Sequence, residues 1–124
     1  MEEYDAERSI MERFIHLSTV MLRYLIKYPL NFRFLEQYLN SPYGVAFRRA
    51  KLLGNGEVSA PYLRLFEDGL AGKIIKDLPM VVLFALAFGP LFAVARDHIF
   101  GFIEMNDVLI MQTVQACWDG IKSA

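Results

Sequence analysis

Cysteine, histidine and unbalanced charge are scarce in this chain of 124 residues. It contains one cysteine, Cys117, and two histidines, and its 13 basic and 14 acidic residues leave a formal net charge of −1. A lone cysteine cannot form an internal disulfide, so nothing requires an oxidising compartment and we expect a cytoplasmic protein. Lysines and arginines are scattered rather than clustered, which gives no electrostatic footprint for nucleic acid. We therefore expect no nucleic-acid binding by this chain alone.

Patterns for catalysis, metal binding and phosphate binding are also missing. Neither His16 nor His98 has a carboxylate or cysteine at ligand spacing. The GNG at 54–56 lacks the strand, spacing and lysine of a phosphate loop. We predict no enzyme, no metal and no cofactor. His16 is expected to be a solvated surface residue, and His98 to serve free carbonyls at a helix end.

The sequence also lacks targeting signals and the alternating pattern of β-strands. Its amino terminus, MEEYDAER, is acidic and polar, unlike a secretory signal or a transit peptide. The length suits a single domain, which we expect over 1–124, and the segment most like a linker is 52–61. Apolar residues recur with helical periodicity, so we predict an all-α bundle of about five to six helices. The predicted helices are 10–28, 31–40, one starting near 59, 78–95 and 103–122.

Prolines and small polar residues mark the expected helix ends. Pro29 ends or kinks the first helix, and Ser41-Pro42 stops the second. Ser59 is a plausible N-cap for the third helix, and Asp77 for the fourth. Within the second helix, Glu36 has no partner four positions away, so we expect it to be exposed.

The fourth predicted helix has no charged side chain for eighteen residues, LPMVVLFALAFGPLFAVA. That length could cross a membrane. However, Pro79 and the Gly89-Pro90 pair interrupt the run, and the flanking charges are mixed. We favour a helix buried in a protein core or interface, with no membrane, and keep a membrane-associated helical protein as the alternative.

The last predicted helix is apolar over most of its circumference. A helix that packs on one core needs an apolar stripe of roughly 100°, and this one is about twice as wide. It therefore needs two apolar neighbours, which predicts that the last two helices form a four-helix interface in a homodimer. Small residues would let the backbones approach closely: Ala85, Ala87, Gly89, Ala93, Ala116 and Gly120.

Aromatic residues are abundant, with ten phenylalanines and six tyrosines. Several are predicted to face inward: Phe14, Phe34, Tyr38, Tyr62, Phe66, Phe84 and Phe88. Ser18 falls in the middle of an apolar arc, beside Phe14 and Met21. Its hydroxyl either bonds back to the carbonyl of Phe14 or is a polar anchor in an apolar ligand pocket.

Three stretches carry a resemblance: FRFLEQYLNSPY, YLRLFEDGLAGKIIKDLP and LIMQTVQACWDGIK. Their order resembles the ligand-binding and dimerisation region of the tetracycline-repressor-like (TetR) family of bacterial transcription regulators, from about residue 14 to residue 122. The resemblance implies a small hydrophobic effector, a homodimer, and operator DNA as the partner of the full-length regulator. It also implies an effector site at Phe14, Ser18, Met21, Phe34, Tyr38, Tyr62, Phe66, Phe84 and Phe88.

The resemblance fails at the amino terminus. Such regulators begin with a helix-turn-helix DNA-binding unit of about fifty residues. Residues 1–8 are too short and too acidic to correspond to it. We expect either an isolated effector domain or a relative without the DNA-binding unit. A structural helical dimer whose aromatic residues only fill the core is a further alternative.

Overall fold

The computed structural model describes the backbone at residues 6–53 and 61–123, and the side chains at 9–46, 49 and 63–123. The described backbone forms helices and no strands, apart from one isolated antiparallel bridge between Ile75 and Lys122. This confirms the predicted all-α fold. The helices are α1 (Ala6–Lys27), α2 (Pro29–Leu39), α3 (Pro42–Leu53), α4 (Pro61–Ala71), α5 (Met80–Ile99) and α6 (Asp107–Ile121).

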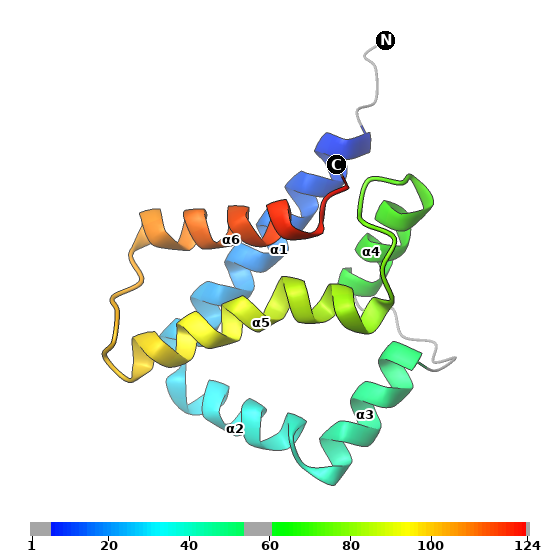
Figure 1. Cartoon of the computed structure of the whole chain (residues 1–124). Helices are drawn as coiled ribbons and strands as arrows, with labels where there is room; N and C mark the ends of the chain where they lie inside the picture. Colours follow the sequence, from blue (N-terminus) through cyan, green and yellow to red (C-terminus); the bar gives the residue numbers. More distant parts are fainter. Residues whose placement is uncertain (1–5, 54–60, 124) are drawn as a thin grey trace.

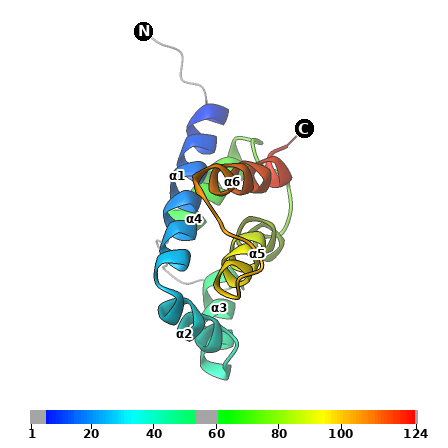
Figure 2. The same cartoon turned by 90° about the vertical axis from the view of Figure 1, so that its left-hand side faces the viewer.

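Helix α1 is the centre of the arrangement. It packs against α4, α5 and α6, with α5 and α6 crossing it on the same side (Figures 1 and 2). Helices α2 and α3 pack on each other in a V below this group, where α2 contacts α1 and α3 contacts α5 (Figure 1). The fold is thus a four-helix group with a two-helix extension.

The core lies where α1, α5 and α6 meet. Residues Ile10, Phe14, Leu22 and Leu25 of α1 are buried, and this confirms the predicted inward orientation of Phe14. The rings of Phe14 and Trp118 pack with their centroids 5.7 Å apart. The other buried residues of α5 and α6 are Leu83, Ala87, Phe88, Leu91, Ala95, Ile110, Val114, Cys117 and Ile121.

The prolines start helices as well as ending them. Helix α2 begins at Pro29 and ends at Leu39, as the Ser-Pro pair predicts, but α3 begins at Pro42 and was not predicted. Proline suits the first helical turn because its backbone angle is already helical and its missing N–H needs no partner there. The Ser41 hydroxyl accepts a hydrogen bond from the Gly44 N–H at 3.1 Å, as an N-cap does. The predicted cap at Ser59 lies outside the described residues.

The predicted ends of α5 and α6 need correction. Asp77 does not cap α5: the N-cap is Pro79, which makes no side-chain cap bond, and the helix continues through Pro90 to Ile99. The Pro79 carbonyl instead accepts from the N–H groups of Val82 and Leu83. Helix α6 begins at Asp107 rather than at 103, because the Asn106 side chain accepts from the Leu109 N–H at 2.9 Å and caps it there.

Candidate functional site

The residues predicted to bind an effector fall into two groups. Phe14, Ser18, Phe66 and Phe88 are buried and Met21 and Phe84 are half-buried, all on α1, α4 and α5; we call these six the inner group. Phe34 and Tyr38 lie on α2 and are 74% and 40% exposed. Tyr62 belongs to α4, but its side chain is outside the described residues.

Three rings of the inner group form an aromatic cluster between α4 and α5. The centroid distances are 5.1 Å for Phe66–Phe84, 5.0 Å for Phe84–Phe88 and 6.3 Å for Phe66–Phe88. Such pairs contribute about 0.5–1.5 kcal/mol each beyond the burial of their area. The cluster therefore attaches α4 to α5.

Ser18 is the buried polar residue of the inner group. It is 0% exposed, and its hydroxyl has no hydrogen-bond partner in the described structure. The possible bond back to the Phe14 carbonyl is thus not made. Leaving a buried donor unpaired costs about 1–3 kcal/mol, so this hydroxyl is a polar group that the packing of α1 leaves unsatisfied.

Phe34 and Tyr38 instead line an open hollow on the surface. Tyr24, Asn31 and Leu35 complete its lining, and its volume is about 380 Å³. The Asn31 side-chain amide donates to the Tyr24 hydroxyl at 3.1 Å. Because the hollow contains no residue of the inner group, the predicted site is divided between two places.

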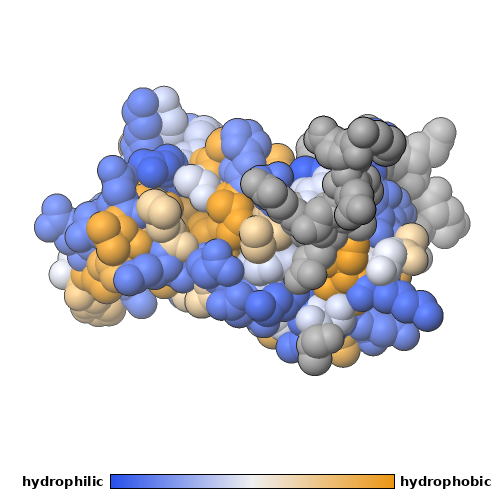
Figure 3. Space-filling view, turned by 90° about the horizontal axis from the view of Figure 1, so that it is seen from above, coloured by the Kyte–Doolittle hydropathy of each residue, from blue (hydrophilic) through white to orange (hydrophobic). Residues whose placement is uncertain are grey.

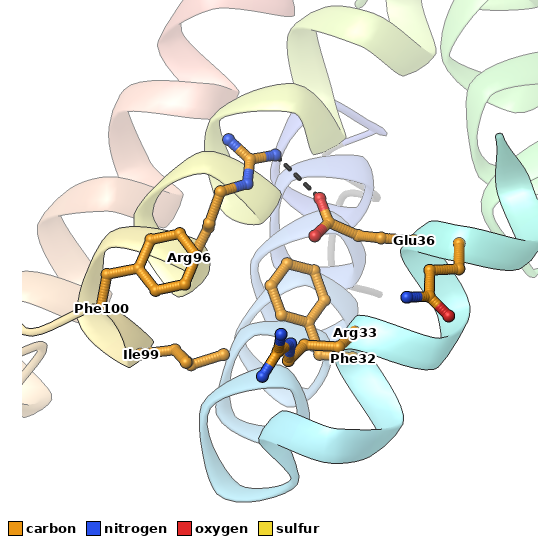
Figure 4. A pocket seen from close by; sticks show the side chains of 7 residues that line it. Phe32, Arg33, Glu36, Arg96, Ile99 and Phe100 are labelled. Atoms are coloured by element: carbon orange, nitrogen blue, oxygen red, sulfur yellow. Dashed lines mark hydrogen bonds and ion pairs between the residues drawn. The ribbon is translucent and has the colours of Figure 1, made fainter.

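A second, smaller pocket lies between α2 and the carboxyl end of α5 (Figure 4). Its volume is about 120 Å³, and its lining is Phe32, Arg33, Glu36, Gln37, Arg96, Ile99 and Phe100. Arg96 donates to Glu36 across 2.8 Å, and the Glu36 side chain is only 28% exposed, so the prediction that Glu36 is exposed is wrong. The hydrogen bond with Glu36, and next its negative charge, raise the pKa of Arg96 above its ordinary value.

The environments of the two histidines and Cys117 are those of surface or structural residues. His16 is exposed, as predicted. His98 does not serve a carbonyl; its Nδ1 accepts a hydrogen bond from the Met105 N–H at 3.1 Å and holds the turn after α5. Cys117 is buried, and burial raises the pKa of its thiol. Among the described residues, no group of three or more histidine, cysteine, aspartate or glutamate side chains could hold a metal ion.

Helices α5 and α6 leave apolar side chains uncovered on their outer faces. Helix α6 packs on both α1 and α5, which accounts for much of its wide apolar arc, yet Val108 and Met111 remain 62% and 66% exposed. On α5, Val82 and Leu86 are exposed too. Seen from above, hydrophobic surface lies open between hydrophilic residues (Figure 3). We call Val82, Leu86, Val108, Met111 and Ala116 the outer face.

The length and composition of Met80–Ile99 would allow this helix to cross a membrane. Only 28% of its apolar window is buried inside the structure. Core helices of soluble proteins also reach this length and hydropathy, so this observation alone does not identify a membrane span. The exposed apolar positions of this helix are Val81, Val82, Ala85, Leu86, Gly89 and Pro90, and its other apolar positions are buried or half-buried in the described structure.

The comparison with protein families accounts for the order of these helices. The family model described as "Tetracyclin repressor-like, C-terminal domain" matches residues 9–122. The chain belongs to this family. The match covers α1 to α6 and confirms the resemblance read from the sequence. No curated protein and no solved structure matches the chain. Tetracycline-repressor-like regulator domains are in general not enzymes and are in general soluble.

Sequence reasoning missed the pocket between α2 and α5. Glu36 and Arg96 are 60 positions apart, so no local spacing relates them. Phe32 was not predicted as a site residue, although it is buried and stacks on Phe92 with a centroid distance of 5.7 Å. The available signal was the run Phe32–Gln37, which places an arginine, a glutamate and an amide beside an apolar residue.

Proposed function

We propose that this chain is the effector-sensing and dimerisation domain of a tetracycline-repressor-like transcription regulator that acts in the cytoplasm. The single observation that carries the proposal is the outer face of α5 and α6 in a chain of this family: only 28% of the apolar window of α5 is buried. A dimeric regulator domain needs one surface that contacts its second copy and one site that binds its effector. The described structure offers a candidate for each.

The outer face supports a two-fold contact between copies. Specific interfaces remove about 1,200 Å² or more of total surface, which two helices from each copy can supply. An added Cβ at the exposed Gly89 would have no neighbour within 4 Å, and Ala116 is also exposed. Short side chains at these positions let a partner helix approach closely. In this proposal α5 and α6 of two copies form the four-helix interface.

The inner group supports an apolar effector. Its rings offer aromatic contacts, and the unpaired Ser18 hydroxyl offers one hydrogen bond. Apolar pockets with a few placed polar groups are typical of small-molecule sites. The effector is therefore a small hydrophobic molecule with one polar atom that pairs with Ser18. The exposed hollow at Phe34 and Tyr38 is the other candidate place for it.

Control of DNA binding belongs to the full-length regulator. An effector shifts a two-state protein only by binding one state more tightly than the other. In this proposal, effector binding near α1, α4 and α5 changes how the dimer holds its DNA-binding units on operator DNA. This chain alone binds no nucleic acid.

The test of the dimer is sedimentation of the wild-type chain and of Ala116→Glu at micromolar concentration in detergent-free buffer. The wild type should sediment as a dimer. The glutamate places an unpaired charge in the contact, so the variant should sediment as a monomer or aggregate while its far-ultraviolet dichroism stays helical. Ala46→Glu on the exposed surface of α3 is the matched control and should stay dimeric. A monomeric wild type would overturn the dimer.

Membrane association is the second candidate, favoured by the length and hydropathy of α5. It makes a different prediction for the same protein. A chain that needs α5 in a bilayer would stay in the membrane fraction unless detergent is added, whereas the proposed regulator domain is extracted by buffer alone. Recovery of the chain only with detergent would favour this alternative.

A further inference from the structure

The pocket between α2 and the end of α5 combines a ring-lined floor with two guanidinium groups. Phe32, Ile99 and Phe100 supply the apolar part. Arg33 and Arg96 lie at two edges of the pocket in the close view, with the ring of Phe32 between them (Figure 4). This pocket shares no residue with the inner group or with the outer face, so it is a separate feature of the domain.

The charges around the pocket favour an anion. Arg33, Arg96 and Glu36 together carry a formal charge of +1. Glu36 engages Nη2 of Arg96, whereas no hydrogen bond or ion pair is found for the Arg33 guanidinium in the described part of the chain. An arginine fork matches a carboxylate with two parallel hydrogen bonds, which are about twice as strong as neutral ones. One positive group at the pocket is thus available to a ligand.

The size and the floor favour one aromatic ring. The volume of about 120 Å³ is close to the ~150 Å³ of an engineered apolar cavity that binds benzene. Phe32 is 1% exposed and stacks on Phe92, so it closes the floor of the pocket and leaves almost no ring surface to a ligand. Phe100 is 59% exposed and can close over a ligand from the other side. An offset or edge-to-face contact with a ligand ring suits the exposed ring of Phe100.

We propose that this pocket binds a small organic acid with a single aromatic ring. Its carboxylate pairs with Arg33 within the field of Arg96, and its ring packs against the exposed ring of Phe100, above the floor that Phe32 closes. The binding joins α2 to α5, which are otherwise connected here by the Glu36–Arg96 pair and the Phe32–Phe92 stack. The proposal does not depend on the proposed effector site or dimer, because it uses none of their residues.

The test is a titration of the full chain with benzoate, followed by the NMR signals of the arginine Nε–H groups and the phenylalanine rings. Benzamide is the uncharged analogue of benzoate, and acetate is a carboxylate that lacks the ring. Benzoate should give saturable shifts at Arg33 and Phe100. Benzamide should bind about tenfold more weakly, because a charge-assisted hydrogen bond is lost. Acetate should give no saturable shift of the rings.

Variants then locate the site. Arg33→Gln and Phe100→Ala should each weaken benzoate binding about five- to tenfold, and both change exposed side chains. Arg64→Gln on the exposed surface of α4 is the matched control and should leave the affinity unchanged. The proposal is overturned if benzoate gives no saturable shift, if benzamide binds equally well, or if Arg33→Gln binds like the wild type. The first two outcomes need only the wild-type chain, so a variant that fails to fold does not obscure them.

Discussion

Arg96 Nη2 lies 2.8 Å from Glu36 Oε2 and thereby links the last turns of α5 to the middle of α2. The two side chains are 45% and 28% exposed, so water screens the attraction. Among the described contacts it is the ion pair that joins the α2–α3 extension to α5. Its effect is therefore local, on the attachment of α2, rather than on the whole bundle.

Removing this pair should cost little global stability. We expect Glu36→Gln to lower the free energy of unfolding by at most about 1 kcal/mol, and less at high salt. A double-mutant cycle with Arg96→Gln, read by urea unfolding, measures the coupling. The pKa of Arg96 is raised in the folded state, so its stabilising contribution is fully present below the unfolded pKa and is lost only at strongly alkaline pH. The coupling energy should therefore not vary with pH near neutrality. A coupling of several kcal/mol would contradict an exposed pair.

Ser18→Ala should leave the fold as stable as the wild type or stabilise it by up to about 1 kcal/mol. The substitution removes a fully buried hydroxyl that has no partner, so no hydrogen bond is lost. Ser41→Ala is the control: it removes the acceptor of the Gly44 N–H at the start of α3 and should cost about 0.5–2 kcal/mol. A loss of stability at Ser18 equal to that at Ser41 would mean that the Ser18 hydroxyl is paired.

The helices were predictable to the extent that they depend on local patterns. Apolar periodicity identified α1 close to its observed bounds. It missed α3, because a Ser-Pro pair ends one helix and also starts the next. The prediction that Phe34 faces inward was wrong, because α2 carries aromatic rings on several sides and the sequence alone cannot identify which side faces the core. The Glu36–Arg96 contact depends on how α2 lies against α5, which no local pattern records.

Gly69→Ala should destabilise the chain because α4 touches the loop before α5 at this point. A Cβ at residue 69 would lie 2.3 Å from Cδ1 and 2.6 Å from Cγ1 of Ile75, which is buried. Overpacking of this kind costs about 1–3 kcal/mol. In an Ile75→Ala background these two atoms are gone, so Gly69→Ala should cost little there. Equal costs in both backgrounds, measured by urea unfolding, would exclude the clash.

Cys117 should make the stability depend on pH at the alkaline end. Burial raises the pKa of its thiol in the folded state, so above the unfolded pKa of about 8.5 the unfolded chain loses a proton that the folded chain keeps. Stability is thus unaffected by this group below that pKa and falls as the pH rises toward the folded pKa. Denaturation of the wild type and of Cys117→Ala between pH 7 and about 10 should show a steeper decline for the wild type. Parallel curves would rule out this contribution.

The two candidate places for a hydrophobic effector can be separated by one pair of variants. A ligand that binds only the folded chain stabilises it by about 2.7 kcal/mol at a hundredfold excess over its Kd. We expect apolar compounds with one hydrogen-bonding atom to raise the thermal midpoint of the wild type. Ser18→Ala should reduce that rise if they occupy the inner group, whereas Tyr38→Ala should reduce it if they occupy the surface hollow.

We expect Ser18→Ala, rather than Tyr38→Ala, to reduce the ligand-induced rise of the thermal midpoint. The Ser18 hydroxyl is buried without a partner, whereas Tyr38 is 40% exposed. Each variant is compared with its own ligand-free midpoint, so that a change in intrinsic stability does not enter the result. Compounds that lack the hydrogen-bonding atom are the control ligands, and they should raise the thermal midpoint equally in the wild type and in Ser18→Ala. If a broad set of apolar compounds moves no midpoint, the aromatic residues only fill the core, and the chain is a helical dimer without an effector.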